Sequence, residues 1–89
     1  MGHMRVNVKL GEPLWRATGE RRLGLNWPAG TLVTVADVLA RLAAEHPAFA
    51  AAHAAAPYRL FVDARLVGNN SAPLDEGQTL FVLLPAIGG

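Results

Sequence analysis

The sequence predicts an α+β domain in which a mixed sheet of four to five strands carries one main helix on one face. Three observations lead to this fold class. Residues 5–10 and 22–27 alternate between polar and apolar side chains, which is typical of half-buried strands. Residues 34–46 carry an apolar stripe with helical spacing. Residues 78–84 form a nearly continuous apolar run, which favours a central strand covered on both faces.

The first half of the chain predicts two strands joined by a long connection. Val6, Val8 and Leu10 fall on one face of the first strand because side chains alternate along extended backbone. Gly-Glu-Pro at 11–13 ends that strand, and residues 14–19 are expected to form a loop or short turn. Leucines and a tryptophan alternate in the same way along the second strand.

The main helix has a marked start and a marked end. Its apolar stripe consists of Val35, Val38, Leu39 and Leu42. Thr34 is the expected N-cap, and Asp37 stands at the third helical position, where it also favours the positive end of the helix dipole. Pro47 cannot continue the hydrogen-bond ladder, so the helix is expected to end near His46.

The second half predicts a short helix followed by three strands. Residues 47–56 are rich in alanine, and Phe49 is expected to anchor this short helix to the core. The strands are predicted at 58–62, 65–67 and 78–84. One helix on one face of the resulting sheet is the natural layered arrangement.

Composition excludes several kinds of function. The chain has no cysteine, so it has no disulfide, thiolate nucleophile or cysteine-bound metal. Eight basic and seven acidic residues give a net charge of +1, which predicts no nucleic-acid partner. No segment is long and apolar enough to cross a membrane, so we expect a cytoplasmic monomer of one small domain.

Candidate sites for metal binding or independent catalysis are poor. His46 and His53 lie seven residues apart without a third ligand, so no metal site is expected. Ser71 has no visible histidine or acidic companion. We therefore expect a carrier or non-catalytic subunit rather than an enzyme that acts alone.

Five motifs occur in a fixed order and end in a diglycine. They are residues 13–19 (PLWRATG), 34–42 (TVADVLARL), 61–67 (FVDARLV), 73–77 (PLDEG) and 84–89 (LPAIGG). This ordered set resembles the ubiquitin-like β-grasp sulfur carriers, which include the small subunit of molybdopterin synthase and the thiamine sulfur carrier. The resemblance covers nearly the whole chain. It divides the sequence into a vector-derived remnant (1–3), a β-grasp domain (4–84) and a flexible C-terminal diglycine tail (85–89).

The resemblance implies acyl chemistry at Gly89. A ubiquitin-activating-type adenylating enzyme would use ATP to adenylate the Gly89 carboxylate, a sulfur-donor protein would convert it to a thiocarboxylate, and a sulfur-accepting synthase subunit would take the sulfur. No cofactor is expected on the chain itself. Gly89 has no β-carbon to hinder attack on its carbonyl, and Gly88 lets the tail adopt backbone angles closed to other residues.

Four further residues are expected to serve partner binding. Pro85 would stiffen the exit from the last strand, and Ile87 would be an apolar peg in a partner's channel. Phe81 and Leu83 share one face of the last strand, and the residues between and beside them share the other. One face meets the helix, while the other is either covered or offered to a partner. Trp15, in the predicted loop, is either a core residue or an interface anchor.

Two functions other than a sulfur carrier fit the same sequence, a protein modifier and a passive interaction module. The activated terminus is also what a ubiquitin-like modifier needs to form isopeptide bonds with lysines. The sulfur is open to several destinations, namely molybdenum cofactor, thiamine, cysteine synthesis and tRNA thiolation. A third hypothesis is a passive interaction module of the same fold whose diglycine has no role.

Overall fold

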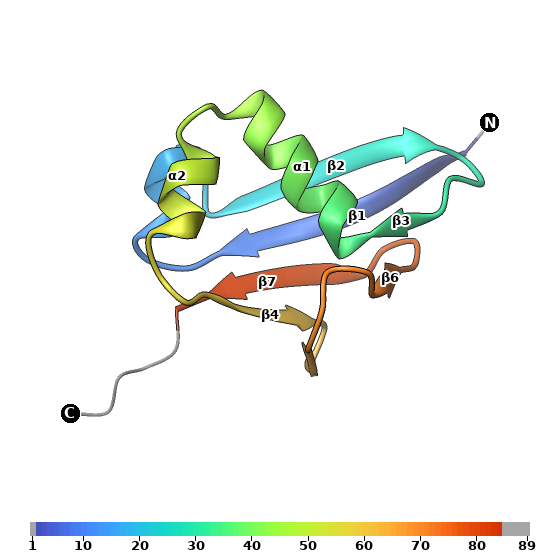
Figure 1. Ribbon diagram of the computed structural model, residues 1–89. Coiled ribbons are helices and arrows are strands. Elements are labelled where there is room, and N and C mark those ends of the chain that lie inside the picture. The colour runs from blue at the N-terminus through green and yellow to red at the C-terminus, as the bar shows by residue number, and fades with distance from the viewer. Residues whose placement is uncertain (1, 85–89) are drawn as a thin grey trace.

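The computed structural model describes residues 2–84, and the predicted tail residues Pro85, Ile87, Gly88 and Gly89 lie outside this range. Figure 1 shows the arrangement of the elements. In chain order they are β1 (His3–Leu10), the 3-10 helix η1 (Leu14–Ala17), β2 (Arg22–Pro28), β3 (Val33–Thr34), α1 (Val35–Glu45), α2 (Phe49–Ala54), β4 (Arg59–Val62), β5 (Arg65–Val67), β6 (Pro73–Leu74) and β7 (Thr79–Leu83).

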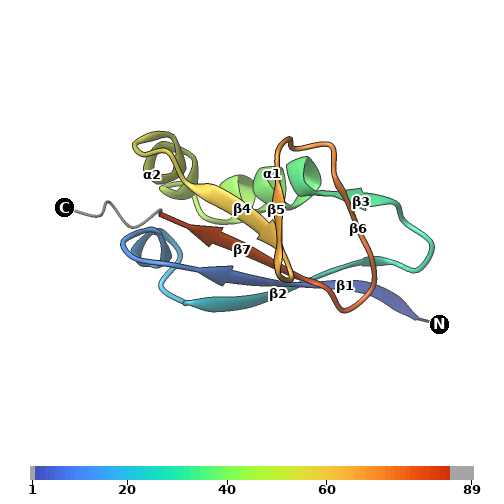
Figure 2. The same ribbon diagram turned by 90° about the horizontal axis from the view of Figure 1, so that it is seen from below.

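Five strands form one mixed sheet in the order β2-β1-β7-β4-β5. The central pair, β1 and β7, is parallel, and the other three pairs are antiparallel. Both helices lie on one side of this sheet, as Figures 1 and 2 show from two directions. The predicted α+β architecture, with a mixed sheet and a main helix on one face, is therefore confirmed.

A second, two-stranded ribbon of β3 and β6 was not predicted. It pairs Val33 with Leu74 and Thr34 with Pro73. Two residues are too few to show an alternating pattern, so only the folded chain brings these segments together. The first strand also begins earlier than expected, at His3, because Met4 pairs with Trp27 of β2 and is buried in the core.

The core lies between the helices and the inner face of the sheet. The alternation predicted for β1 is confirmed, since Val6, Val8 and Leu10 are all at most 3 % exposed. From α1, the buried residues are Val35, Val38 and Leu42. The predicted loop at 14–19 contributes as well, because its η1 turn buries Leu14 completely beside α2. Apolar burial on this single side of the sheet supplies the main stabilisation.

The helix α1 begins and ends where the sequence indicates. The Thr34 side chain accepts a hydrogen bond from the Asp37 backbone N–H, and the Asp37 carboxylate accepts one from the Thr34 backbone N–H at 2.9 Å. This capping box satisfies two backbone donors that a helix start leaves free. The helix ends at Glu45, with His46 as C-cap, directly before Pro47.

The last strand is central, as predicted, but the expectation that both of its faces are covered is wrong. Leu80 and Val82 are fully buried against the helices, while Phe81 and Leu83 are only partly buried on the opposite face. Both helices pack on the same side, so no helix of residues 2–84 covers the other face. The apolar run reflects two different environments, a core and an outer surface.

The helix α2 holds a partly buried histidine within an aromatic stack. The His53 ring is stacked between Phe49, at 5.6 Å between centroids, and Tyr58, at 5.7 Å. Partial burial lowers the pKa of the His53 imidazole below its ordinary value of 6.5. The folded state therefore binds this proton less readily than the unfolded state does.

We expect the protein to lose stability as the pH falls from 7.5 through 6.5 and toward the lowered folded pKa of His53. Below that pKa both states are protonated and this loss is complete. The loss is less than about 1 kcal/mol because water screens a partly exposed ring. Urea unfolding of the wild type and of His53→Phe at pH 7.5 and 5.5 measures it. The expectation fails if both proteins show the same pH dependence across this interval.

Candidate functional site

The end of β7 is held beside the turn that follows β1. The backbone N–H of Gly11 donates to the Val82 carbonyl at 3.0 Å. A β-carbon at Gly11 would lie 3.1 Å from the Leu83 side chain, which is tighter than ordinary packing. The absence of a side chain at Gly11 therefore lets Leu83 lie close against the turn. This contact fixes the place at which the chain leaves the sheet toward the predicted tail.

An apolar patch lies on the outer face of the sheet, on the side opposite the helices. It is formed by Phe61 of β4, Leu66 of β5, and Phe81 and Leu83 of β7. Phe61 is the direct cross-strand partner of both Phe81 and Leu66, so three strands contribute to one surface. Leu66 is 53 % exposed. Apolar side chains gathered on an exposed sheet face are typical of an interaction surface.

The structure thus decides which residues of the last strand face the helices and which face outward, a choice that the sequence left open. Phe81 and Leu83, the predicted partner-binding residues, lie together on the outer face next to the strand end. Phe61 and Leu66 belong to the same patch and were missed. Alternation with the buried Val62 was a signal for Phe61, but the pairing register that places it beside Phe81 cannot be read from the sequence.

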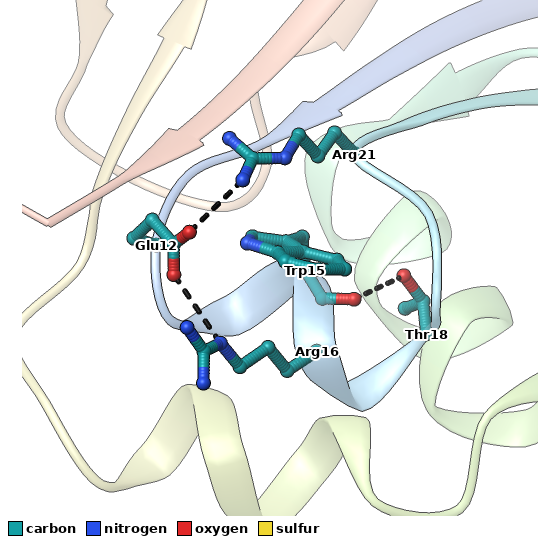
Figure 3. A network of polar contacts seen from close by, with 5 residues as sticks. All are labelled: Glu12, Trp15, Arg16, Thr18 and Arg21. Carbon is teal, nitrogen blue, oxygen red and sulfur yellow. Dashed lines mark hydrogen bonds and ion pairs between the residues drawn. The ribbon is translucent and has the colours of Figure 1, made fainter.

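A cluster of charged and aromatic side chains stands at the same end of the sheet (Figure 3). The Glu12 carboxylate accepts a hydrogen bond from Arg21 Nη2 at 3.0 Å and pairs with Arg16 Nε at 3.4 Å. Both guanidinium groups lie over the Trp15 ring, with Arg21 at 4.6 Å from its centroid. Thr18 Oγ1 donates to the Trp15 carbonyl at 3.1 Å and closes the turn.

The cluster also perturbs the acid at its centre. The Trp15 indole N–H, and then the positive charges of Arg16 and Arg21, lower the pKa of the Glu12 carboxyl below its ordinary value of 4.5. The Trp15 Nε1 atom is buried and has no partner in hydrogen-bond geometry. Trp15 is thus partly buried within its own loop, between two arginines, rather than a freely exposed anchor.

The structure adds two observations on other kinds of site. Within residues 2–84, no three histidine, cysteine or acidic side chains gather closely enough to hold a metal ion. His46 is the C-cap of α1 and His53 belongs to the aromatic stack of α2. In the same part of the chain, each helix is too short for a membrane crossing.

Comparison with solved structures identifies the fold. The crystal structure of SAMP1 from Haloferax volcanii superposes with a TM-score of 0.76 at 19 % identity, over 96 % of this chain and 99 % of that one. The chain has the ubiquitin-like β-grasp fold. The solution structure of small archaeal modifier protein 1 from Methanosarcina acetivorans gives a TM-score of 0.75 at 20 % identity, with full coverage of both chains.

A third β-grasp neighbour comes from a complex. It is the complex of subunits 1 and 2 of the molybdopterin-converting factor from Helicobacter pylori, with a TM-score of 0.66 at 19 % identity over 97 % of this chain and 100 % of that one. No protein-family model matches the sequence, and no curated protein does. The neighbours belong to the group of ubiquitin-like proteins that the ordered motifs resemble, so the predicted β-grasp fold is confirmed.

Proposed function

We propose that this protein is a sulfur carrier whose Gly89 carboxyl group is activated and converted to a thiocarboxylate. The observation that carries the proposal is the position of the apolar patch. It lies on the uncovered face of the central strand, directly before the segment 84–89 with its diglycine end. A partner that binds this face is therefore close to the start of the C-terminal tail, residues 85–89.

The proposed reaction has two balanced steps. The Gly89 carboxylate attacks the α-phosphorus of ATP and forms an acyl-adenylate, with pyrophosphate as leaving group. A hydrosulfide-equivalent sulfur nucleophile then adds to the carbonyl carbon, and AMP leaves with the electron pair of the broken C–O bond. Activation is needed because a free carboxylate repels nucleophiles and oxide is a poor leaving group. The adenylating enzyme supplies the ATP site, and this chain supplies the acyl group.

The tail and the sheet face have separate tasks in this proposal. Phe81 and Leu83 dock the adenylating enzyme, Pro85 aims the tail, and Ile87 fills an apolar channel ahead of the diglycine. Gly88 allows backbone angles closed to other residues, and Gly89 leaves its carbonyl unhindered. A synthase subunit then accepts the sulfur, which is supported by the neighbour seen in a complex of molybdopterin-converting factor subunits.

Mass spectrometry of the intact protein tests the proposal. Incubation with the adenylating enzyme from the same genome, ATP and sulfide is expected to raise the mass by about 16 Da, because sulfur replaces one oxygen. The cellular protein is also expected to end at Gly89. Omission of ATP is the control and leaves the mass unchanged. A mass that stays constant with the correct partner and all substrates rejects the carrier function.

The neighbours named as small archaeal modifier proteins favour a second candidate, a protein modifier. The same acyl-adenylate would then be attacked by a lysine Nζ, which forms an isopeptide bond and releases AMP. Affinity purification of a tagged chain under denaturing conditions distinguishes the two. Conjugates in which tryptic digestion leaves residues 66–89 of this chain on a lysine support the modifier, whereas a thiocarboxylate without conjugates supports the carrier.

A further inference from the structure

The outer sheet face has a second half beside the apolar patch, and this half is strongly positive. Arg5, Lys9 and Arg22 line a hollow of about 450 Å³ over β1, β2 and β7, which we name the cationic groove. Phe81 lines the same hollow, so the groove and the apolar patch are continuous. Lys9 Nζ lies 5.8 Å from the centre of the Phe81 ring and marks the boundary between them.

No acidic side chain of residues 2–84 pairs with the three cations of the groove. The ion pairs found within residues 2–84 join Glu12 to Arg16 and Arg21, and Arg41 to Glu45. The Glu76 carboxylate accepts a hydrogen bond from the Arg5 backbone N–H at 3.0 Å, and Glu76 lines a different cavity. The chain as a whole has nearly balanced charge. The three cations of the groove nevertheless lie together on one face without an ion-pair partner within residues 2–84.

The arrangement of these cations works against stability. Lys9 and Arg22 are direct cross-strand partners on the same face. Like charges in this position repel each other and destabilise an antiparallel pair. The glycine at position 24 makes room for the third cation, because a β-carbon there would collide with the Arg5 guanidinium that lies across it. The Arg5 guanidinium therefore covers the β2 backbone at Gly24, and Lys9 and Arg22 line the same groove.

We propose that the cationic groove binds an acidic segment of the partner protein that docks on the apolar patch. The segment carries at least two carboxylates beside an apolar side chain, so that the carboxylates meet Lys9 and Arg22 while the apolar side chain reaches Phe81. A small anion fits less well, because the groove is open and the backbone N–H groups of β1 are used in pairing with its neighbours. The inference rests on the proposed function only in taking the outer face as the docking surface.

An NMR titration tests the inference without any activating enzyme. The probe is the peptide acetyl-Glu-Asp-Phe-Glu-Asp-amide, added to the isotope-labelled full chain at low salt. It is expected to shift amide resonances of β1, β2 and β7, and the shifts are expected to weaken as salt rises. The analogue with Gln and Asn in place of the acids is expected to bind at least about 10-fold more weakly.

Two arginine variants separate a local effect from a general charge effect. Arg22→Gln is expected to weaken peptide binding by about 3- to 5-fold, whereas Arg65→Gln, which removes an equal charge from an exposed position on β5, leaves it unchanged. Arg22→Gln is also expected to unfold at the same or a higher urea concentration than the wild type, because it relieves the repulsion with Lys9. If Arg22 served only to stabilise the fold, Arg22→Gln would instead unfold at a lower urea concentration than the wild type.

Several outcomes overturn the inference. They are absence of binding, equal binding of the neutral peptide, equal effects of the two arginine variants, and tighter binding of inorganic phosphate or ATP than of the peptide. The last result would assign the groove to a small anion. Because this titration does not involve Gly89, a failed titration leaves the thiocarboxylate proposal standing, and a failed thiocarboxylate assay leaves the groove proposal standing.

Discussion

Deletion of Gly89 is expected to abolish the mass gain of about 16 Da completely, because the chain then presents its carboxyl group one residue too early. A residue spans about 3.5 Å when extended, and displacement of a reacting atom by that distance removes it from any site built around the longer tail. The measurement is the intact mass after incubation with the adenylating enzyme, ATP and sulfide.

Competition supplies the control for this deletion. The shortened chain keeps residues 2–84 and with them the apolar patch, so we expect it to unfold at the same urea concentration as the wild type. We also expect it to inhibit charging of the wild type by occupying the same enzyme. If the shortened chain gains the mass of sulfur at the normal rate, Gly89 is not the reactive residue.

Leu80→Ala is expected to destabilise the protein by about 3 kcal/mol, which is the largest effect on stability that we predict. Leu80 is fully buried between the sheet and the helices, so truncation of its side chain leaves a cavity among residues that cannot close around it. Urea unfolding followed by far-UV circular dichroism gives the free energy of unfolding.

The next residue along β7 is the matched control. Phe81 lies on the opposite face and is only partly buried, so Phe81→Ala is expected to cost about 1 kcal/mol or less. The same variant is expected to raise the concentration of carrier at which the adenylating enzyme works at half its maximal rate. Equal destabilisation by the two variants would show that both faces of β7 belong to the core, and the apolar patch would lose its proposed role.

The sequence was informative about the faces of the elements. Alternation identified Val6, Val8 and Leu10 as core, and the stripe with helical spacing identified the buried side of α1. Thr34 and Asp37 formed the predicted capping box because its hydrogen bonds are local and need no tertiary partner. Periodicity and capping depend on residues close in the chain, so they can be read without a structure.

The sequence was less informative where tertiary neighbours decide whether a side chain is buried or a segment is paired. The run at 78–84 is apolar throughout, and the prediction of cover on both faces failed because apolar side chains can also form an exposed patch. The turn at 14–19 hid a buried leucine, since a single residue has no period. The short ribbon of β3 and β6 left no pattern at all.

By itself, the sequence determined the fold class, the inner faces of the strands and the main helix, and it pointed to Gly89 as the candidate reactive group. Only the tertiary structure decided which residues surround Phe81. Phe61 and Leu66 join it from β4 and β5, and Lys9 joins it from β1, through register between strands far apart in the chain. The physical reason is that one sheet surface is formed by side chains from several strands, and its neighbours depend on the register between them. Periodicity in the sequence describes only the two faces of a single strand.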